Sequence, residues 1–229
     1  MYKLTIDKTE FDLSGDWTIE RWMGLQKWDV SLDFNWPRLI SESTGAPLED
    51  CVLIPYETQH VGVALISSLL TPEWRTPKRR LHGHKLVEFN TMSIGTFIDC
   101  ETALGRDLKK WMHMIVAALY NADLEKTKTW SIQDTYPAVS NYLNWRDGLY
   151  KSYASLFEIE DSEVEGAENE SGGPDAAYAW YDFLMVLADE KFLNIEKASE
   201  RGVYEALNYM AWVKDQAKKR ELEAKRLKI

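Results

Sequence analysis

Apolar and polar residues alternate at the start of the chain. Residues 2–6 read Tyr-Lys-Leu-Thr-Ile, and Phe11-Asp12-Leu13 resumes the alternation after the polar residues 7–10. Two alternating stretches around a short polar loop are typical of a β-hairpin. A second hairpin is predicted further along the chain, with its turn near His82-Gly83-His84.

A capped helix is predicted twice in the first half of the chain. Bulky residues from Ile19 to Asp29 recur at helical spacing, and Asp16 or Thr18 can cap the start of this helix. Residues 90–99 have the same order, with a hydroxyl cap, an isoleucine and an aromatic residue three positions later. We interpret this as a similarity between two helix starts, short of a demonstrated repeat.

Further helices are predicted from the same periodicity. In the first half they cover 38–44, where Gly45 can end the helix, and 61–70. The second half is more strongly helical, with amphipathic patterns over 108–119, 139–157, 178–188 and 195–217.

The fold class that follows is mainly α, a helical bundle with one or two small β-hairpins, and an α+β fold is the alternative. We expect residues 1–105 to hold the hairpins and the shorter helices. Residues 106–229 would form a helical part that contains an acidic, glycine-rich loop at about 158–175 and a basic C-terminal tail. The two parts could equally form a single domain.

Charge is concentrated in one segment. The chain has 27 basic and 37 acidic residues, which gives a formal charge of −10. Residues 152–190 contain eleven acidic residues and no Lys or Arg, so this segment carries −11 and the rest of the chain +1. The acidic average argues against a dedicated nucleic-acid binder, because phosphate contacts need a basic surface. The nearly neutral remainder still leaves room for a local contact with DNA.

The sequence predicts no catalytic, cofactor-binding or metal-binding residues. His82 and His84 alternate as metal ligands can, but the surrounding basic residues would repel a cation. Cys51 and Cys100 stand in apolar surroundings, where they are expected to pack as small hydrophobic residues. No apolar stretch is long enough to span a bilayer and no N-terminal signal region is present, so we expect a cytoplasmic protein without a membrane contact.

The residue types favour binding to partner proteins. Ten tryptophans are spread over the predicted elements, and tryptophan and arginine dominate interaction hot spots, although several tryptophans must build the core. The basic and acidic clusters could pair with unlike surfaces, or could simply be solvated. The candidate partner-binding residues are Trp28, Trp36 and Trp130; the basic Arg75, Lys78, Arg79, Arg80 and Lys85; the acidic Glu158, Glu160, Asp161, Glu163 and Glu165; and Lys218, Lys219 and Arg220 of the tail.

Several segments resemble a known group of proteins. They are Tyr2-Lys3-Leu4-Thr5-Ile6-Asp7, residues 16–22 (Asp-Trp-Thr-Ile-Glu-Arg-Trp), Phe89 to Glu101, Ala117-Ala118-Leu119-Tyr120, and Tyr178-Ala179-Trp180-Tyr181 with Leu187-Ala188. In their order along the chain and in their residue types, these segments resemble small proteins of tailed bacteriophages, including crAss-like phages. The acidic segment and the basic tail match that group least well.

The resemblance implies a non-enzymatic structural protein of the virion, a component of the neck, ring or tail. Its partners would be other virion or assembly proteins and copies of itself in a ring-like oligomer, and it would reside in the host cytoplasm during assembly and then in the virion. The alternatives are a tail assembly chaperone that is not retained in the virion, a DNA-contacting neck protein that uses Arg75–Lys85, and, last, a small enzyme whose site is assembled from scattered residues. The resemblance implies no cofactor.

Overall fold

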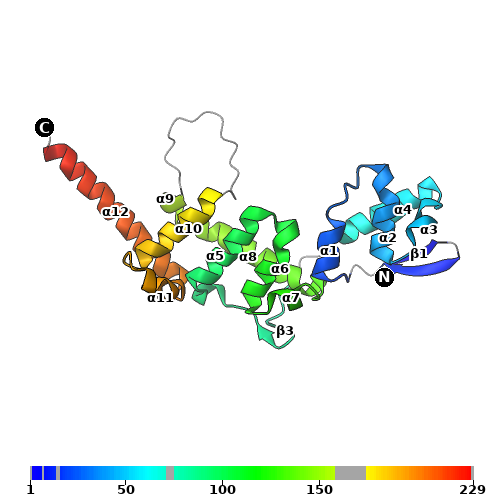
Figure 1. The fold of residues 1–229 in the computed structure, drawn as a ribbon, viewed down its shortest axis with the longest axis horizontal. Helices are drawn as coiled ribbons and strands as arrows, with labels where there is room; N and C mark the ends of the chain where they lie inside the picture. Colours follow the sequence, from blue (N-terminus) through cyan, green and yellow to red (C-terminus); the bar gives the residue numbers. More distant parts are fainter. Residues whose placement is uncertain (1, 7, 14–15, 71–74, 158–173, 228–229) are drawn as a thin grey trace.

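The structure is a computed structural model that describes residues 2–6, 8–13, 16–70, 75–157 and 174–227. The predicted fold class is confirmed. Within these residues, twelve α-helices and three short 3-10 helices accompany two antiparallel sheets of two strands each. The elements follow one another along a long axis, with the N-terminal helices at one end and the last helix at the other (Figure 1).

The N-terminal module is a β-hairpin packed with four helices, of which α1 also packs against the first helical unit described below. Both predicted hairpins form, and in the first one Leu4 pairs with Phe11. Its second strand begins at Thr9, so the loop is shorter than residues 7–10. The elements of this module are β1 (Tyr2–Ile6), β2 (Thr9–Leu13), α1 (Ile19–Leu25), η1 (Asp33–Asn35), α2 (Trp36–Thr44), α3 (Leu48–Val52) and α4 (Tyr56–Leu70). Gly45, with a φ of 81°, ends α2 in the left-handed conformation, as the sequence predicts.

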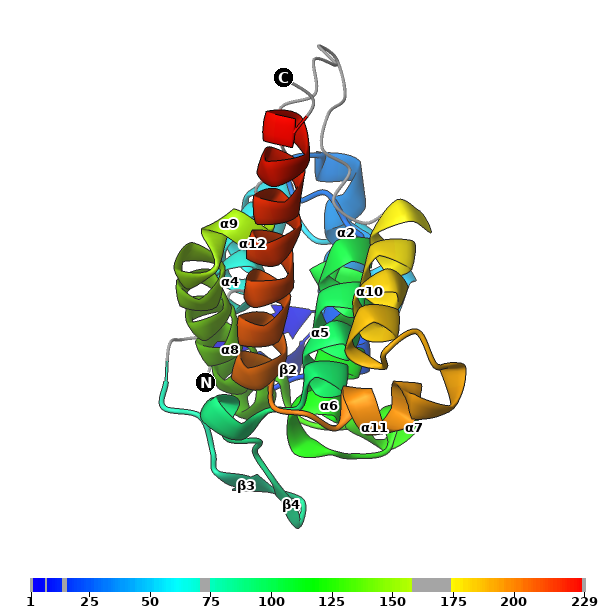
Figure 2. The same ribbon diagram turned by 90° about the vertical axis from the view of Figure 1, so that its left-hand side faces the viewer.

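The rest of the chain forms two helical units of similar construction. In each unit a central helix (α6 or α10) is followed by a short helix and then by a long one, and the start of an earlier helix (α1 or α5) packs against them. The first unit is α6 (Leu108–Tyr120), α7 (Leu124–Thr127) and α8 (Ile132–Ser152), with α1. The second unit is α10 (Pro174–Leu187), η3 (Phe192–Asn194), α11 (Ile195–Ser199) and α12 (Val203–Leu227), with α5 (Ile94–Arg106). Figure 2 looks onto the second unit, with α10 and α12 in front.

A reciprocal pair of backbone hydrogen bonds joins the helix starts of the first unit. The amide of Ile19 in α1 donates to the carbonyl of Trp130 at 2.9 Å, and the amide of Ile132 in α8 donates to the carbonyl of Trp17 at 2.8 Å. The first amides of a helix have no partner inside the helix, so this junction satisfies one in each helix.

The second unit repeats this junction with different residues. The amide of Ile94 in α5 donates to the carbonyl of Arg201 at 2.7 Å, and the amide of Val203 in α12 donates to the carbonyl of Met92 at 2.8 Å. The β-branched residues that begin these four helices are all fully buried: Ile19, Ile94, Ile132 and Val203. The similarity predicted between residues 16–22 and 90–99 therefore corresponds to two equivalent junctions. Thr18 and Ser93 cap their helices by accepting from the amides of Arg21 and Thr96.

A buried carboxylate ties α5 to α8. Glu101 accepts hydrogen bonds from Arg146 Nε at 2.6 Å and Nη2 at 2.8 Å, and from the hydroxyls of Tyr142 and Tyr150, each at 2.8 Å. Two donors therefore reach each carboxylate oxygen, which is the condition under which a charge can be buried. Burial and the neighbouring carboxylate raise the pKa of Tyr142 and Tyr150, so both hydroxyls remain donors.

Small elements connect these parts, and one predicted helix is divided. The connecting elements are β3 (Arg80–Leu81), β4 (His84–Lys85), η2 (Phe89–Thr91) and α9 (Ala154–Phe157).

The prediction of one continuous helix over 195–217 is wrong, because Glu200, Arg201 and Gly202 leave the helix to form the junction with α5. The helix predicted over 139–157 begins at Ile132 and breaks at Tyr153.

One cluster of buried apolar residues runs from Leu4 to Leu207 and includes members of both predicted parts of the chain. A boundary after residue 105 would fall at the last residue of α5 and would separate α5 from α6, the two helices with the most extensive mutual contact. Both cysteines are free and fully buried, and burial raises the pKa of each thiol. Among the described helices none is both long and apolar enough to cross a membrane.

Glu101→Ala is expected to destabilise the protein by about 2–4 kcal/mol, because it leaves a guanidinium and two hydroxyls without their acceptor. Urea denaturation followed by tryptophan fluorescence measures this loss. Glu205→Ala, which removes the exposed partner of Arg201, is the matched control and should change stability by less than about 1 kcal/mol. Equal losses in the two variants would contradict a supporting role for the buried carboxylate.

Candidate protein-interaction surfaces

Exposed apolar side chains gather at the turn between α3 and α4. Leu53 is 81% exposed, and the apolar side chains of Leu48, Val52, Tyr56 and Val61 are exposed around it. We call these residues, together with Glu49, Asp50 and Glu57, the N-terminal surface. Large apolar residues that gather on an exposed face often mark a contact site.

The turn that presents Leu53 is held from inside. The amide of Gln59, which is buried, donates to the carbonyls of Cys51 at 3.2 Å and Ile54 at 2.9 Å. These bonds fix the chain between the two helices with Cys51 and Ile54 pointing into the core. Leu53, between them, is left on the outside.

A hollow of about 360 Å³ lies beside this turn. Its walls are Thr5 and Ile6 at the end of β1, Leu53, Ile54 and Pro55 of the turn, and Asp50 and Thr58 from α3 and α4. The hollow thus combines apolar walls with one carboxylate. A projecting apolar side chain next to a cation would match this lining.

A second exposed surface follows α12. Trp212 is 56% exposed and its ring packs beside that of Tyr209, with centroids 6.0 Å apart. Each residue from Ala217 to Arg226 is exposed, so this half of the helix projects beyond the bundle (Figure 1). We call Tyr209, Trp212, Lys219 and Arg220, which share one face of α12, the C-terminal surface.

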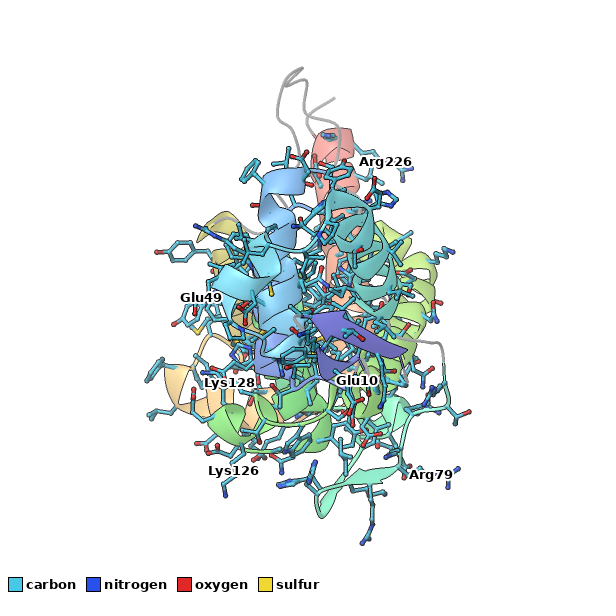
Figure 3. The ribbon with its side chains drawn as sticks, turned by 90° about the vertical axis from the view of Figure 1, so that its right-hand side faces the viewer. Glu10, Glu49, Arg79, Lys126, Lys128 and Arg226 are labelled. Carbon is cyan, nitrogen blue, oxygen red and sulfur yellow. The ribbon has the colours of Figure 1, made fainter. Side chains whose placement is uncertain are left out.

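The two surfaces carry opposite charge and lie at opposite ends of the molecule. Between Leu48 and Val61 there are three carboxylates and no Lys or Arg, whereas residues 214–226 have six basic and three acidic residues. Figure 3 looks onto the N-terminal end and shows Glu49 on α3 and Arg226 on α12. Lys218, Lys219 and Arg220 therefore belong to a basic helix that is exposed, and their role in partner binding stays a prediction.

Further apolar side chains are exposed on the second unit. Leu193 is 92% exposed and Phe192 71%, both in η3, and Tyr178 and Tyr181 are exposed on α10. Among the described residues, no charged surface that would complement these side chains is evident.

The predicted basic cluster is partly engaged within the chain. Lys78 pairs with Asp134 at 2.6 Å and Lys85 with Glu88 at 2.8 Å. The hairpin rests on α6 and the start of α8, because the hydroxyl of Tyr120 donates to the carbonyl of Lys78 and the rings of His82 and His84 lie against Trp130. Arg79 and Arg80 are exposed at this hairpin and Arg75 is exposed ahead of it, and Arg79 is near enough to help lower the pKa of Glu88. The hairpin is thus supported by the helices beside it, and Lys78, Arg79 and Lys85 each have an acidic neighbour within the chain.

The tryptophan candidates differ in burial. Trp36 and Trp130 are buried, so they build the core rather than face solvent, and Trp36 donates from its indole to the carbonyl of Val30 at 2.9 Å. Trp28 is half-buried between Lys27 and Arg38, whose cations lie 4.9 and 5.4 Å from its ring. The acidic candidates Glu158, Glu160, Asp161, Glu163 and Glu165 lie outside the described residues.

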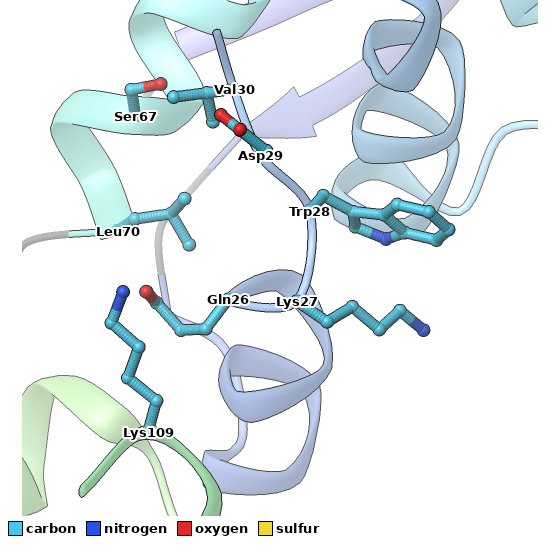
Figure 4. Close-up of a pocket in the computed structure, with 8 residues that line it drawn as sticks. All are labelled: Gln26, Lys27, Trp28, Asp29, Val30, Ser67, Leu70 and Lys109. Carbon is cyan, nitrogen blue, oxygen red and sulfur yellow. The ribbon is translucent and has the colours of Figure 1, made fainter. Parts of the chain in front are cut away.

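Two further hollows lie on the surface formed by the described residues. One, of about 430 Å³, lies between residues 26–30, which follow α1, the end of α4 and the start of α6. There Gln26 and Lys109 extend toward each other near Leu70 while the indole of Trp28 points away (Figure 4). The other, of about 750 Å³, is a polar groove from Lys85 to Asn121 beside the second hairpin. In the described part of the chain no three side chains of metal-binding type come together. Neither hollow therefore assembles a recognisable reaction centre from described residues.

Comparison with protein-family models, curated proteins and solved structures gave no match. The interaction surfaces must therefore be judged on their own geometry, and the resemblance to tailed-phage proteins stays a prediction from sequence.

The N-terminal surface was not predicted from the sequence. The run Cys51-Val52-Leu53-Ile54 resembles an ordinary buried segment, but only its outer residues are buried and the two between them are exposed, which periodicity does not resolve over so short a run. Pro55 directly after the run is the one local signal that the chain turns here.

A buried histidine adds a pH-sensitive element to the core. His113 on α6 is 7% exposed, and its Nδ1 has no hydrogen-bond partner among the described residues. Burial lowers the pKa of His113 and Lys128 adds to this, while Glu125 and Glu20 act in the opposite direction. Because the pKa of His113 is lower in the folded state than in the unfolded state, the unfolded state binds the proton first, and stability is lost as the pH falls from about 6.5 toward the folded pKa.

His113→Leu is expected to reduce the loss of stability between pH 7.5 and pH 5. In the wild type the unfolded state gains stability by protonating His113, and leucine cannot bind this proton. Thermal unfolding at both pH values, with the exposed His60→Asn as control, measures the effect. If the variant and the wild type lose stability equally on acidification, His113 is not a source of the pH dependence.

Leu53→Ser and Trp212→Ser should each leave the free energy of unfolding within about 0.5 kcal/mol of the wild type, because exposed side chains add little to folding. Leu39→Ala, at a fully buried position, should lose about 2–5 kcal/mol. Chemical denaturation compares the three. A large loss in either serine variant would mean that these residues serve folding and would remove them as interaction candidates.

Proposed function

We propose that this chain is a non-enzymatic structural or assembly protein that acts through protein–protein contacts. The observation that carries the proposal is the exposure of apolar side chains at both ends of an elongated helical array, beside charges of opposite sign. Such surfaces are unfavourable in an isolated chain and favourable in a complex, because association removes the apolar area from water.

The biological context follows from the resemblance to tailed-phage proteins. In that context the chain is a neck, ring or tail component of the virion, present in the host cytoplasm during assembly, with other virion proteins and further copies of itself as partners. A tail assembly chaperone uses the same kinds of contact transiently. DNA contact by the basic hairpin is less favoured, because Lys78 and Lys85 are paired with acids of the chain itself.

Purified phage particles separate the first two roles. Quantitative mass spectrometry of virions should detect the protein at a fixed number of copies per particle if it is a structural component. Detection in infected cells without detection in virions would support the chaperone instead. A strict monomer in mass photometry, alone and with virion proteins added, would contradict the proposal in both forms.

A further inference from the structure

We propose that copies of this chain associate head to tail, with the C-terminal surface of one copy docked on the N-terminal surface of the next. The inference rests on the proposed function and specifies its contact. Both members of the pair occur on one chain, one acidic and one basic, and each has exposed apolar residues at its centre. A second copy is thus a partner whose charge complements each surface.

The exposed stripe on α12 has the composition of an interaction site. Lys219 and Arg220 follow Trp212 by seven and eight residues, which places them two turns further along the same face. Tyr209 and Trp212 supply the aromatic area, and the two cations extend the stripe into the part of the helix that projects beyond the bundle. Lys218 and Lys225 lie on the opposite face of the same helix.

The acceptor offers matching features. The hollow beside Leu53 has apolar walls for an aromatic side chain, and Asp50 lies at its edge. Glu49 and Glu57 are exposed on the two helices that flank the turn, so they can face Lys219 and Arg220. Apolar anchors surrounded by complementary charges are the usual arrangement of a specific interface.

Geometry prevents one chain from making this contact with itself. The two surfaces lie at opposite ends of the long axis, with both helical units between them (Figure 1). A contact between unlike surfaces of identical chains repeats from copy to copy, and it yields a ring when the rotation closes and a filament when it does not.

Two charge-reversed variants of the full chain test the contact. In K219E/R220E both surfaces are acidic, and in E49K/E57K the N-terminal surface becomes basic to face a basic helix. Each variant alone is expected to associate about tenfold or more weakly than the wild type at low salt, because like charges oppose each other. An equimolar mixture should recover association, since each variant then presents a complementary surface to the other.

K218E/K225E is the matched control, with the same charge change on the opposite face of α12, and it should associate like the wild type. Mass photometry and sedimentation velocity over a concentration series measure all five samples, and circular dichroism checks that each variant is folded.

Three results would overturn the head-to-tail contact: a mixture that fails to recover association, a control variant weakened as much as K219E/R220E, or a wild type that stays monomeric at high concentration and low salt. Loss of association in K219E/R220E without recovery in the mixture would indicate a different acidic partner for α12. Wild-type chains that stay monomeric alone but bind virion proteins would leave the proposed function in place while removing this contact.

Discussion

The paired helix starts are the constraint on which the architecture depends. At each junction two helices that are distant in sequence exchange backbone hydrogen bonds, and the first residue of each helix is fully buried. The amide donors at a helix start must find partners, and here each start supplies a partner for the other. The requirement fixes where α8 and α12 begin and how they cross α1 and α5. It also explains why the helix predicted over 195–217 is interrupted.

Repeating this junction produces an elongated array instead of a closed bundle. Each unit packs against its neighbour, as α5 does against α6, and a linear arrangement always has two terminal faces. The N-terminal module occupies one end and α12 the other. Between them the Glu101 carboxylate and its four hydrogen bonds join α5 of the second unit to α8 of the first, so the array is held by polar as well as apolar contacts.

Periodicity predicted most of the local structure. The helices over 38–44, 108–119 and 178–188, both hairpins and the caps at Thr18 and Ser93 are visible from residue types because local rules govern them. The break at Gly202 and the pairing of Glu101 with Arg146 depend on residues more than forty positions away, so no local pattern reveals them. The same limit applies to the surfaces: Leu53 and Trp36 are both apolar, and only the packing of the turn and of α2 decides which one remains outside.

Hydrogen–deuterium exchange at low and high protein concentration is the most direct test of an array that associates through unlike ends. The account predicts that concentration slows exchange in residues 48–61 and 209–226, while the basic hairpin at 75–85 and the centre of the array exchange as they do in dilute protein. Slowed exchange confined to the hairpin, or to Phe192 and Leu193, would contradict the account. Exchange that does not depend on concentration at all would do so as well.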